Sequence, residues 1–325
     1  MSFKDIRGQD RAIAILKNAA RQDRLSHAYI FWGPEGVGKK MTALNFAKML
    51  NCQDARDEEP CEECASCKKI NSFNHPDVFL FSPDKEGSSV GIEKIRALIK
   101  DIGLKPYEAK KKIYIVDNAQ ALTREAANAF LKTLEEPPTD ALLILIAPEL
   151  RDLLPTIVSR SQAVKFYALG VNETARILVK EHKIDEPQAK ALAHLSSGRM
   201  GVALKYKEGD FLKKRNRIVD SLARNEFFDS DFDAVSKPEL KAYLDIALTW
   251  YRDILITKAS GADAVFGLVN IDKSDAIIKE AKRLKFSRIE EIIKQIILTG
   301  SFLDSNANPK LTIAVLGLAA LENAR

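Results

Sequence analysis

The sequence predicts an α/β protein with a doubly wound parallel sheet, followed by a C-terminal region made of helices alone. Up to about residue 167, short apolar runs alternate with stretches of helical periodicity, a pattern that favours a parallel sheet with helices on both faces. After residue 168 the strand signals fade and only helical patterns follow. At 325 residues the chain is long for one hydrophobic core, so we expect two or three domains.

Five segments in the first half are predicted as strands: the largely apolar runs 27–32, 78–81, 112–116 and 142–146, and residues 162–166 as a fifth. The fourth run, LLILI, is apolar at every position, as strands buried on both faces tend to be. Helices are predicted at residues 10–24 and 39–50, and a further helix follows Thr123, which suits an N-cap. Pro137 and Pro138 would stop that helix.

The second half predicts helices only. Residues 171–208 contain three helical segments, and the pattern stays helical from about residue 209 to the C-terminus. We therefore expect three domains: residues 1–167 with the sheet, a small helical domain at 168–208, and a larger helical domain at 209–325.

Composition and charge are those of an ordinary folded protein, with 46% hydrophobic and 29% charged residues. The longest apolar run, residues 141–147, is far shorter than the ~18 residues of a membrane span, and the N-terminus has no apolar signal core. The formal net charge of +5 permits a nucleic-acid partner without requiring one. We expect a cytosolic protein with no membrane partner, whose cysteines are thiols or metal ligands.

Residues 33–40, GPEGVGKK, follow the first predicted strand and match a phosphate-binding loop except at the last position. The form G-x-x-x-x-G-K-[ST] uses a hydroxyl after its lysine to hold Mg²⁺. Gly33, Gly36 and Gly38 would let backbone N–H groups surround phosphate oxygens, and Lys39 would reach the β- and γ-phosphates. Lys40 offers no lone pair to a metal, so phosphate binding can survive while hydrolysis suffers. The alternative is a Gly-rich turn without a ligand.

A second nucleotide-site motif ends the third predicted strand, where KKIYIVDNAQAL places Asp117 after an apolar run. In an active ATPase of this architecture the next residue is usually a glutamate that polarises the attacking water. Here it is Asn118, and an amide cannot accept a proton at neutral pH. We therefore predict a degenerate nucleotide site for ATP or ADP, made of Gly33, Gly36, Gly38, Lys39, Lys40 and Asp117.

All four cysteines lie within residues 52–67, in the spacing C-x8-C-x2-C-x2-C. Four thiolates around one ion form a closed zinc site, which holds a loop together and leaves no position for a substrate. The alternatives are four unrelated buried thiols and an iron–sulfur cluster, which also uses closely spaced cysteines. We predict a structural Zn²⁺ site formed by Cys52, Cys61, Cys64 and Cys67.

Together these motifs resemble the AAA+ subunits of the bacterial clamp loader of DNA polymerase III, and most closely those of the delta-prime type. The resemblance covers nearly the whole chain. FKDIRGQDRAIAILKNA is similar to the opening segment of the family, HAYIFWGPEGVGKK to its phosphate loop, and YIVDNAQALTREAANAFLKTLEEPP to its most diagnostic block. The implied fold is an AAA+ domain with a zinc module, a helical lid and an all-α collar that oligomerises. Residues 303–316 resemble the last helix region of the collar.

The resemblance also implies a role for Arg160, within PTIVSRSQAVKF. In active clamp-loader subunits, the arginine of this Ser-Arg motif projects into the ATP site of the adjacent subunit, where it neutralises charge on the transferring phosphoryl group. Ser161 stands where the family usually has cysteine. The sensing arginine of the family's lid falls on Gly201, and Ala147 and Pro148 replace the polar residue that closes the fourth strand. A surface arginine without this role is the alternative at position 160.

The resemblance implies a hetero-pentameric ring with gamma/tau and delta subunits, which loads the sliding clamp onto primer–template DNA. Within this ring we expect a non-hydrolysing subunit, with no ATPase or polymerase activity of its own, that supplies Arg160 as a catalytic finger in trans. The alternatives are an active gamma-type ATPase subunit of the same loader and an unrelated P-loop kinase or switch. The first reading is favoured over the second by Lys40, Asn118, Gly201 and Ala147.

Overall fold

The structure, a computed structural model, describes residues 2–83, 89–138, 140–208, 211–224, 237–261, 267–304 and 308. The chain divides into two compact units. One comprises Met1–Leu169 with Arg199–Gly201, and the other comprises Gly170–Gly198 with Val202–Arg325. The further division of the helical part into a lid and a collar stays a prediction.

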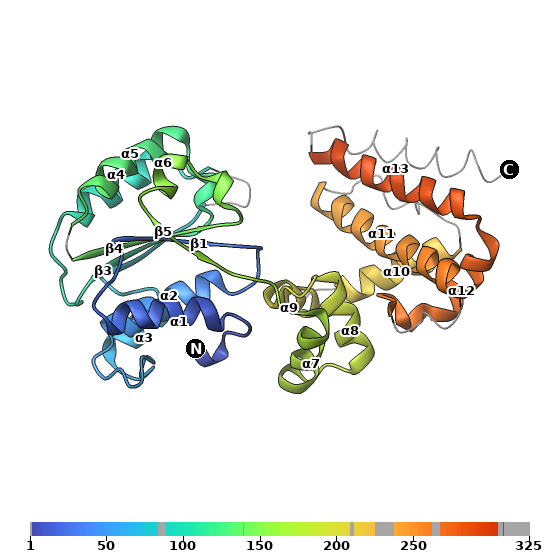
Figure 1. The fold of residues 1–325 in the computed structure, drawn as a ribbon, viewed down its shortest axis with the longest axis horizontal. Helices are drawn as coiled ribbons and strands as arrows, with labels where there is room; N and C mark the ends of the chain where they lie inside the picture. The colour runs from blue at the N-terminus through green and yellow to red at the C-terminus, as the bar shows by residue number, and fades with distance from the viewer. Residues whose placement is uncertain are drawn as a thin grey trace. The chain divides into compact units, whose positions relative to one another are not determined.

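A five-stranded parallel sheet forms the centre of the first unit (Figure 1). Its strands are β1 (Ala28–Trp32), β2 (Val78–Phe81), β3 (Lys112–Val116), β4 (Ala141–Ala147) and β5 (Gln162–Lys165). They lie in the order β2-β3-β4-β1-β5, and every neighbouring pair is parallel. Because the strands are parallel, the segments that follow β1, β3 and β4 leave the sheet at one edge, where ligands bind in such folds. The predicted parallel α/β fold is confirmed.

Helices cover both faces of this sheet (Figure 1). One face carries α1 (Asp10–Arg21), α2 (Lys39–Asn51) and α3 (Ala65–Asn71), and the other carries α4 (Ile92–Ile102), α5 (Arg124–Glu135) and α6 (Pro155–Val158). Short 3₁₀ turns are η1 (Phe3–Asp5), η2 (Ala119–Ala121) and η3 (Leu150–Asp152). Each face has its own core, because alternate residues of the central strands point in opposite directions: Ile144 packs on the α2 side and Leu143 on the α5 side.

Local signals explain where these helices begin and end. Thr123 caps α5 as predicted, since its side-chain oxygen accepts a hydrogen bond from the Ala126 N–H at 3.2 Å. The predicted helix at 10–24 ends earlier, at Arg21, because Asp23 adopts the left-handed conformation with φ of 51°.

The second unit contains α7 (Val171–His182), α8 (Glu186–Leu195), most of α9 (Met200–Glu208), α10 (Phe211–Ala223), α11 (Lys237–Ser260), the turn η6 (Ile271–Lys273), α12 (Ser274–Arg283) and α13 (Phe286–Asp304). Its described residues form no strand, as predicted. Trp250 is fully buried at the centre of the core between α10, α11, α12 and α13. Most of the collar-like segment 303–316 lies outside the described residues.

No helix in the described ranges has both the length and the apolarity to cross a bilayer. The cytosolic location stays a prediction.

Candidate nucleotide site and metal centre

The predicted phosphate loop connects the end of β1 to the start of α2. Gly33, Gly36 and Gly38 have φ of 144°, 76° and 98°, a region that favours glycine. A Cβ on Gly33 would lie 2.3 Å from the carbonyl oxygen of Phe166, so no side chain fits there. The N–H groups of Gly36, Val37 and Gly38 donate to no acceptor in the described part of the chain. Such N–H groups at a helix N-terminus form the arrangement that binds phosphate oxygens.

Lys39 lies against this loop with only 8% of its surface exposed. Its Nζ donates to the carbonyl oxygens of Gly33 and, at 2.7 Å, of Pro34. Burial lowers the pKa of Lys39 to about 8, although the charges of Asp117 and Glu35 act in the opposite direction. A bound phosphate would favour the charged form of this lysine.

Lys40 contacts the acid of the second motif. Its Nζ lies 3.2 Å from Oδ2 of Asp117, which follows β3 and whose N–H donates to the Phe81 carbonyl. The next hydroxyl of α2, on Thr42, is buried and donates to the Gly38 carbonyl at 2.9 Å. These residues do not fit Mg²⁺, because an ammonium stands where the metal would find its hydroxyl ligand and already contacts the carboxylate.

The structure also shows the surroundings of Asn118, Ala147 and Gly201, which the resemblance predicts to replace water-activating and sensing groups. Asn118 adopts the left-handed conformation, with φ of 56°. The carbonyl of Ala147, at the end of β4, accepts a hydrogen bond from the Gly33 N–H at 3.3 Å. The N–H of Gly201, also in the first unit, donates to the Gly36 carbonyl at 2.8 Å. A Cβ on Gly201 would lie 3.0 Å from that oxygen, so a larger residue would have to displace the loop.

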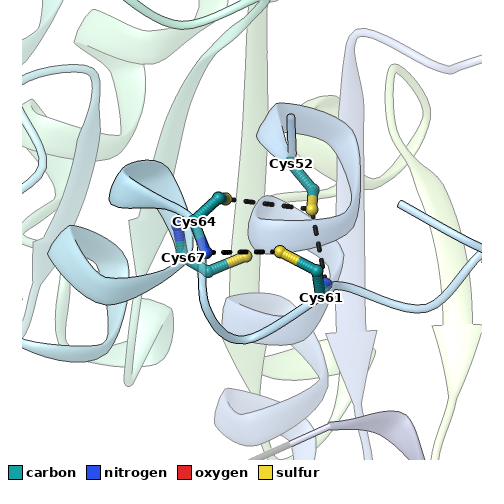
Figure 2. A group of neighbouring side chains, drawn as sticks. All are labelled: Cys52, Cys61, Cys64 and Cys67. Atoms are coloured by element: carbon teal, nitrogen blue, oxygen red, sulfur yellow. Dashed lines mark hydrogen bonds between the residues drawn. The ribbon is translucent and has the colours of Figure 1, made fainter. Parts of the chain in front are cut away.

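The four cysteines converge on one point (Figure 2). Their Sγ atoms all lie within 4.8 Å of one another, and those of Cys52 and Cys64 are 4.0 Å apart. Four sulfurs at the usual distance from one zinc ion would be separated by about 3.8 Å. Cys52 follows the last residue of α2, Cys64 caps α3, and Cys67 lies in its first turn. The donor set therefore fits a thiophilic metal ion.

Hydrogen bonds prepare one of these thiols for a metal. Burial raises the pKa of Cys64, but backbone N–H groups of Gln53 and Cys67 and the neighbouring thiols outweigh burial and bring the pKa down to about 6. Because a thiolate is the form that binds metal, the lowered pKa of Cys64 favours metal binding at this position. Burial raises the pKa of Cys67 instead.

Charged side chains attach the cysteine segment to α2 and to the loop before β3. Lys48 of α2, which is buried, forms an ion pair with Glu62 and donates to Oδ1 of Asn71 at 3.0 Å. Lys110 donates to the Cys52 carbonyl at 3.0 Å. Sequence analysis did not identify these anchors, because they join residues far apart in the chain.

Arg160 lies just after α6, with 36% of its side chain exposed. Its guanidinium lies 2.9 Å from Oε1 of Glu135, the last residue of α5, and donates to the Thr156 carbonyl at 3.1 Å. Glu135 was not singled out from the sequence, although it precedes the Pro-Pro stop of α5. The exposure leaves Arg160 accessible to a partner, and the alternative of a surface arginine stays open. Ser161 buries its Oγ without a hydrogen-bond partner among the described residues.

Comparison with known proteins gives consistent matches. A family model described as DNA polymerase III, delta subunit, matches residues 8–170, half of the chain. The delta-prime subunit of DNA polymerase III of Bacillus subtilis is 32% identical over 312 residues, which are 92% of each chain. The tau subunit of the same organism is 31% identical over 84% of this chain but only 53% of its own length. A gamma subunit-related structure from Thermotoga maritima covers 97% of this chain and all of its own, with 20% identity and a TM-score of 0.41.

The chain belongs to the family of DNA polymerase III clamp-loader subunits. Within this family the predicted resemblance to the delta-prime type is confirmed, because the B. subtilis delta-prime subunit matches over nearly the full length of both proteins.

Proposed function

We propose that this chain is a non-hydrolysing, delta-prime-type subunit of the clamp loader, which supplies Arg160 to the ATP site of a neighbouring subunit. The absence of hydrolysis is supported mainly by the contact between the Lys40 ammonium and Asp117. The ammonium pairs with the carboxylate that would otherwise hold Mg²⁺. Asn118 supports it, since an amide cannot serve as the base for water. The partly exposed guanidinium of Arg160 supports the second part.

The proposed partners are gamma/tau and delta subunits in a hetero-pentamer, the sliding clamp and primer–template DNA. Contacts with DNA would be made mainly to its phosphates, which carry no sequence information. The cysteine cluster would hold Zn²⁺ as a structural ion, and its closed set of four sulfurs leaves no position for a substrate.

The alternative is an active gamma-type ATPase subunit, which the 31% identity to tau favours. ATP turnover by the purified chain separates the two functions. The proposal predicts no turnover by the chain alone, whereas magnesium-dependent turnover that Lys39→Ala abolishes would establish the alternative.

The role of Arg160 is tested in the reconstituted loader. Arginine fingers supplied in trans contribute about 10³-fold or more in rate, so Arg160→Ala should remove the turnover of the one site that this arginine completes. Arg151→Ala is the matched control, because Arg151 also lies in an exposed ion pair, with Glu149. Gel filtration shows whether both variants assemble. Unchanged turnover in an assembled Arg160→Ala loader would refute the finger.

A further inference from the structure

Lys40, in the first turn of α2 directly after the phosphate loop, places its ammonium beside Asp117. Its Nζ is 3.2 Å from the carboxylate, and the side chains of Lys40 and Asp117 are 43% and 19% exposed. In a magnesium-dependent site that space belongs to the ion, which is held by the hydroxyl at position 40 and faces the acid after the neighbouring strand. A divalent cation would here meet an ammonium instead of a lone pair.

The groups that bind phosphate are nevertheless present. The N–H groups of Gly36, Val37 and Gly38 have no acceptor within the described residues, and the buried Lys39 lies against the same loop. An ammonium has three donors, and the ion pair with Asp117 can use at most one of them. At least two donors are left that could form charge-assisted hydrogen bonds with phosphate oxygens.

We propose that the Lys40 ammonium takes the place of Mg²⁺, so that the loop binds a nucleoside di- or triphosphate without a divalent cation. This inference rests on the proposed assignment of the loop as a nucleotide site. It adds that the ligand is the nucleotide without a bound metal ion. A nucleotide held in this way lacks the Lewis acid that polarises the phosphoryl group, so it stays intact and fixes the loop.

ADP binding to the full chain tests the proposal by calorimetry. Buffers are freed of divalent cations with a chelating resin rather than with EDTA, so that a metal held by the cysteines stays in place, and MgCl₂ is added back in excess. The wild-type Kd for ADP should change by no more than about twofold on adding Mg²⁺. Lys40→Thr restores the hydroxyl of the motif, and its affinity without Mg²⁺ should fall roughly tenfold, because one charge-assisted contact is lost.

Addition of Mg²⁺ should recover the affinity of Lys40→Thr. Mn²⁺ gives a second readout, since its electron paramagnetic resonance signal broadens when the ion is held beside bound ADP. With ADP present, the wild type should leave the Mn²⁺ signal as it is with ADP in buffer alone, and Lys40→Thr should broaden it further.

Lys190→Thr is the matched control, because Lys190 is a similarly exposed lysine, paired with Glu186 within α8. It should leave the affinity for ADP and its insensitivity to Mg²⁺ unchanged, and circular dichroism confirms that each variant is folded. Wild-type binding that requires Mg²⁺, or no binding of ADP without Mg²⁺, would overturn the proposal. Neither result would bear on the proposed role of Arg160, because that role is tested separately by measuring ATP turnover of the assembled loader.

Discussion

The side chain of Lys39 is buried together with its ammonium group. Burial lowers its pKa from 10.5 to about 8, and its hydrogen bonds to the Gly33 and Pro34 carbonyls compensate only part of the lost hydration. At neutral pH the folded chain therefore holds a charge that the unfolded chain carries more easily. If the loop binds phosphate as predicted, Lys39 would stabilise the bound anion at the expense of the empty fold, as binding residues commonly do.

The stability of the fold should therefore rise with pH in a defined window. Between about pH 8 and 10.5 the unfolded chain binds more protons at Lys39 than the folded chain, so the free energy of unfolding increases with pH there and is flat with respect to this group below pH 8. Relative to Lys39→Met, the wild type should gain on the order of 3 kcal/mol across this window. Urea unfolding of both proteins at a series of pH values measures the difference. Parallel pH profiles would contradict the assigned pKa.

At the scale of elements, the cysteine cluster links the C-terminal end of α2, which is packed in the core, to α3, which has little support of its own. α3 has only seven residues, and the chain between α2 and α3 contains left-handed residues at Asp57, Glu58 and Glu62. A helix of this length is not stable by itself in water. A metal held by sulfurs from both helices would therefore supply much of the stability of this module.

Cys64→Ser should remove the bound metal and destabilise the module. We expect the metal content, measured by mass spectrometry of the purified protein, to fall from about one ion per chain to near zero, since a structural zinc site needs all four ligands. The melting temperature should fall as well. Ser72→Ala, at the exposed C-terminal end of α3, is the control that should keep the metal. A Cys64→Ser protein with its full metal content would exclude the four-sulfur site.

Helices and strands could be predicted from the sequence where a short stretch of residues carries the signal by itself. The strands at 78–81 and 112–116 agree with the prediction to the residue, because VFLF is a continuous apolar run and KIYIV is apolar or aromatic after its first residue. Helices α3 and α4 were not predicted. Helix α3 is short and begins within the cysteine-rich segment. Helix α4 has no cap residue to mark its start, because Gly91 has no side chain that could cap it. The contact of Lys40 with Asp117 was beyond sequence reasoning, because only the strand order brings these residues together.

At the scale of the whole molecule, each unit carries its own hydrophobic core. Phe46 of α2 is fully buried among residues of the first unit, and Trp250 of α11 among residues of the second. Chains built from separate cores commonly unfold in more than one step. The two units should therefore differ in their response to core substitutions.

Trp250→Ala should lower one calorimetric transition and leave the other in place. Removing a buried aromatic side chain costs about 3–5 kcal/mol, which is enough to separate the transitions. Phe46→Ala is the matched substitution in the first unit and should shift the transition that Trp250→Ala spares. A single transition lowered by both substitutions would show that the two cores unfold as one cooperative system.

Helix α2 connects the two predicted sites of the first unit. It begins directly after Gly38 of the predicted phosphate loop and ends directly before Cys52. The loop therefore lies at the N-terminal end of the helix and a predicted metal ligand at its C-terminal end. Oxidation of the thiols would prevent metal binding at that end. Because two hydrogen bonds between Asn51 and the Lys111 backbone hold the end of the helix independently of any metal, the loss would loosen the cysteine segment and leave the loop at the other end of α2 in place.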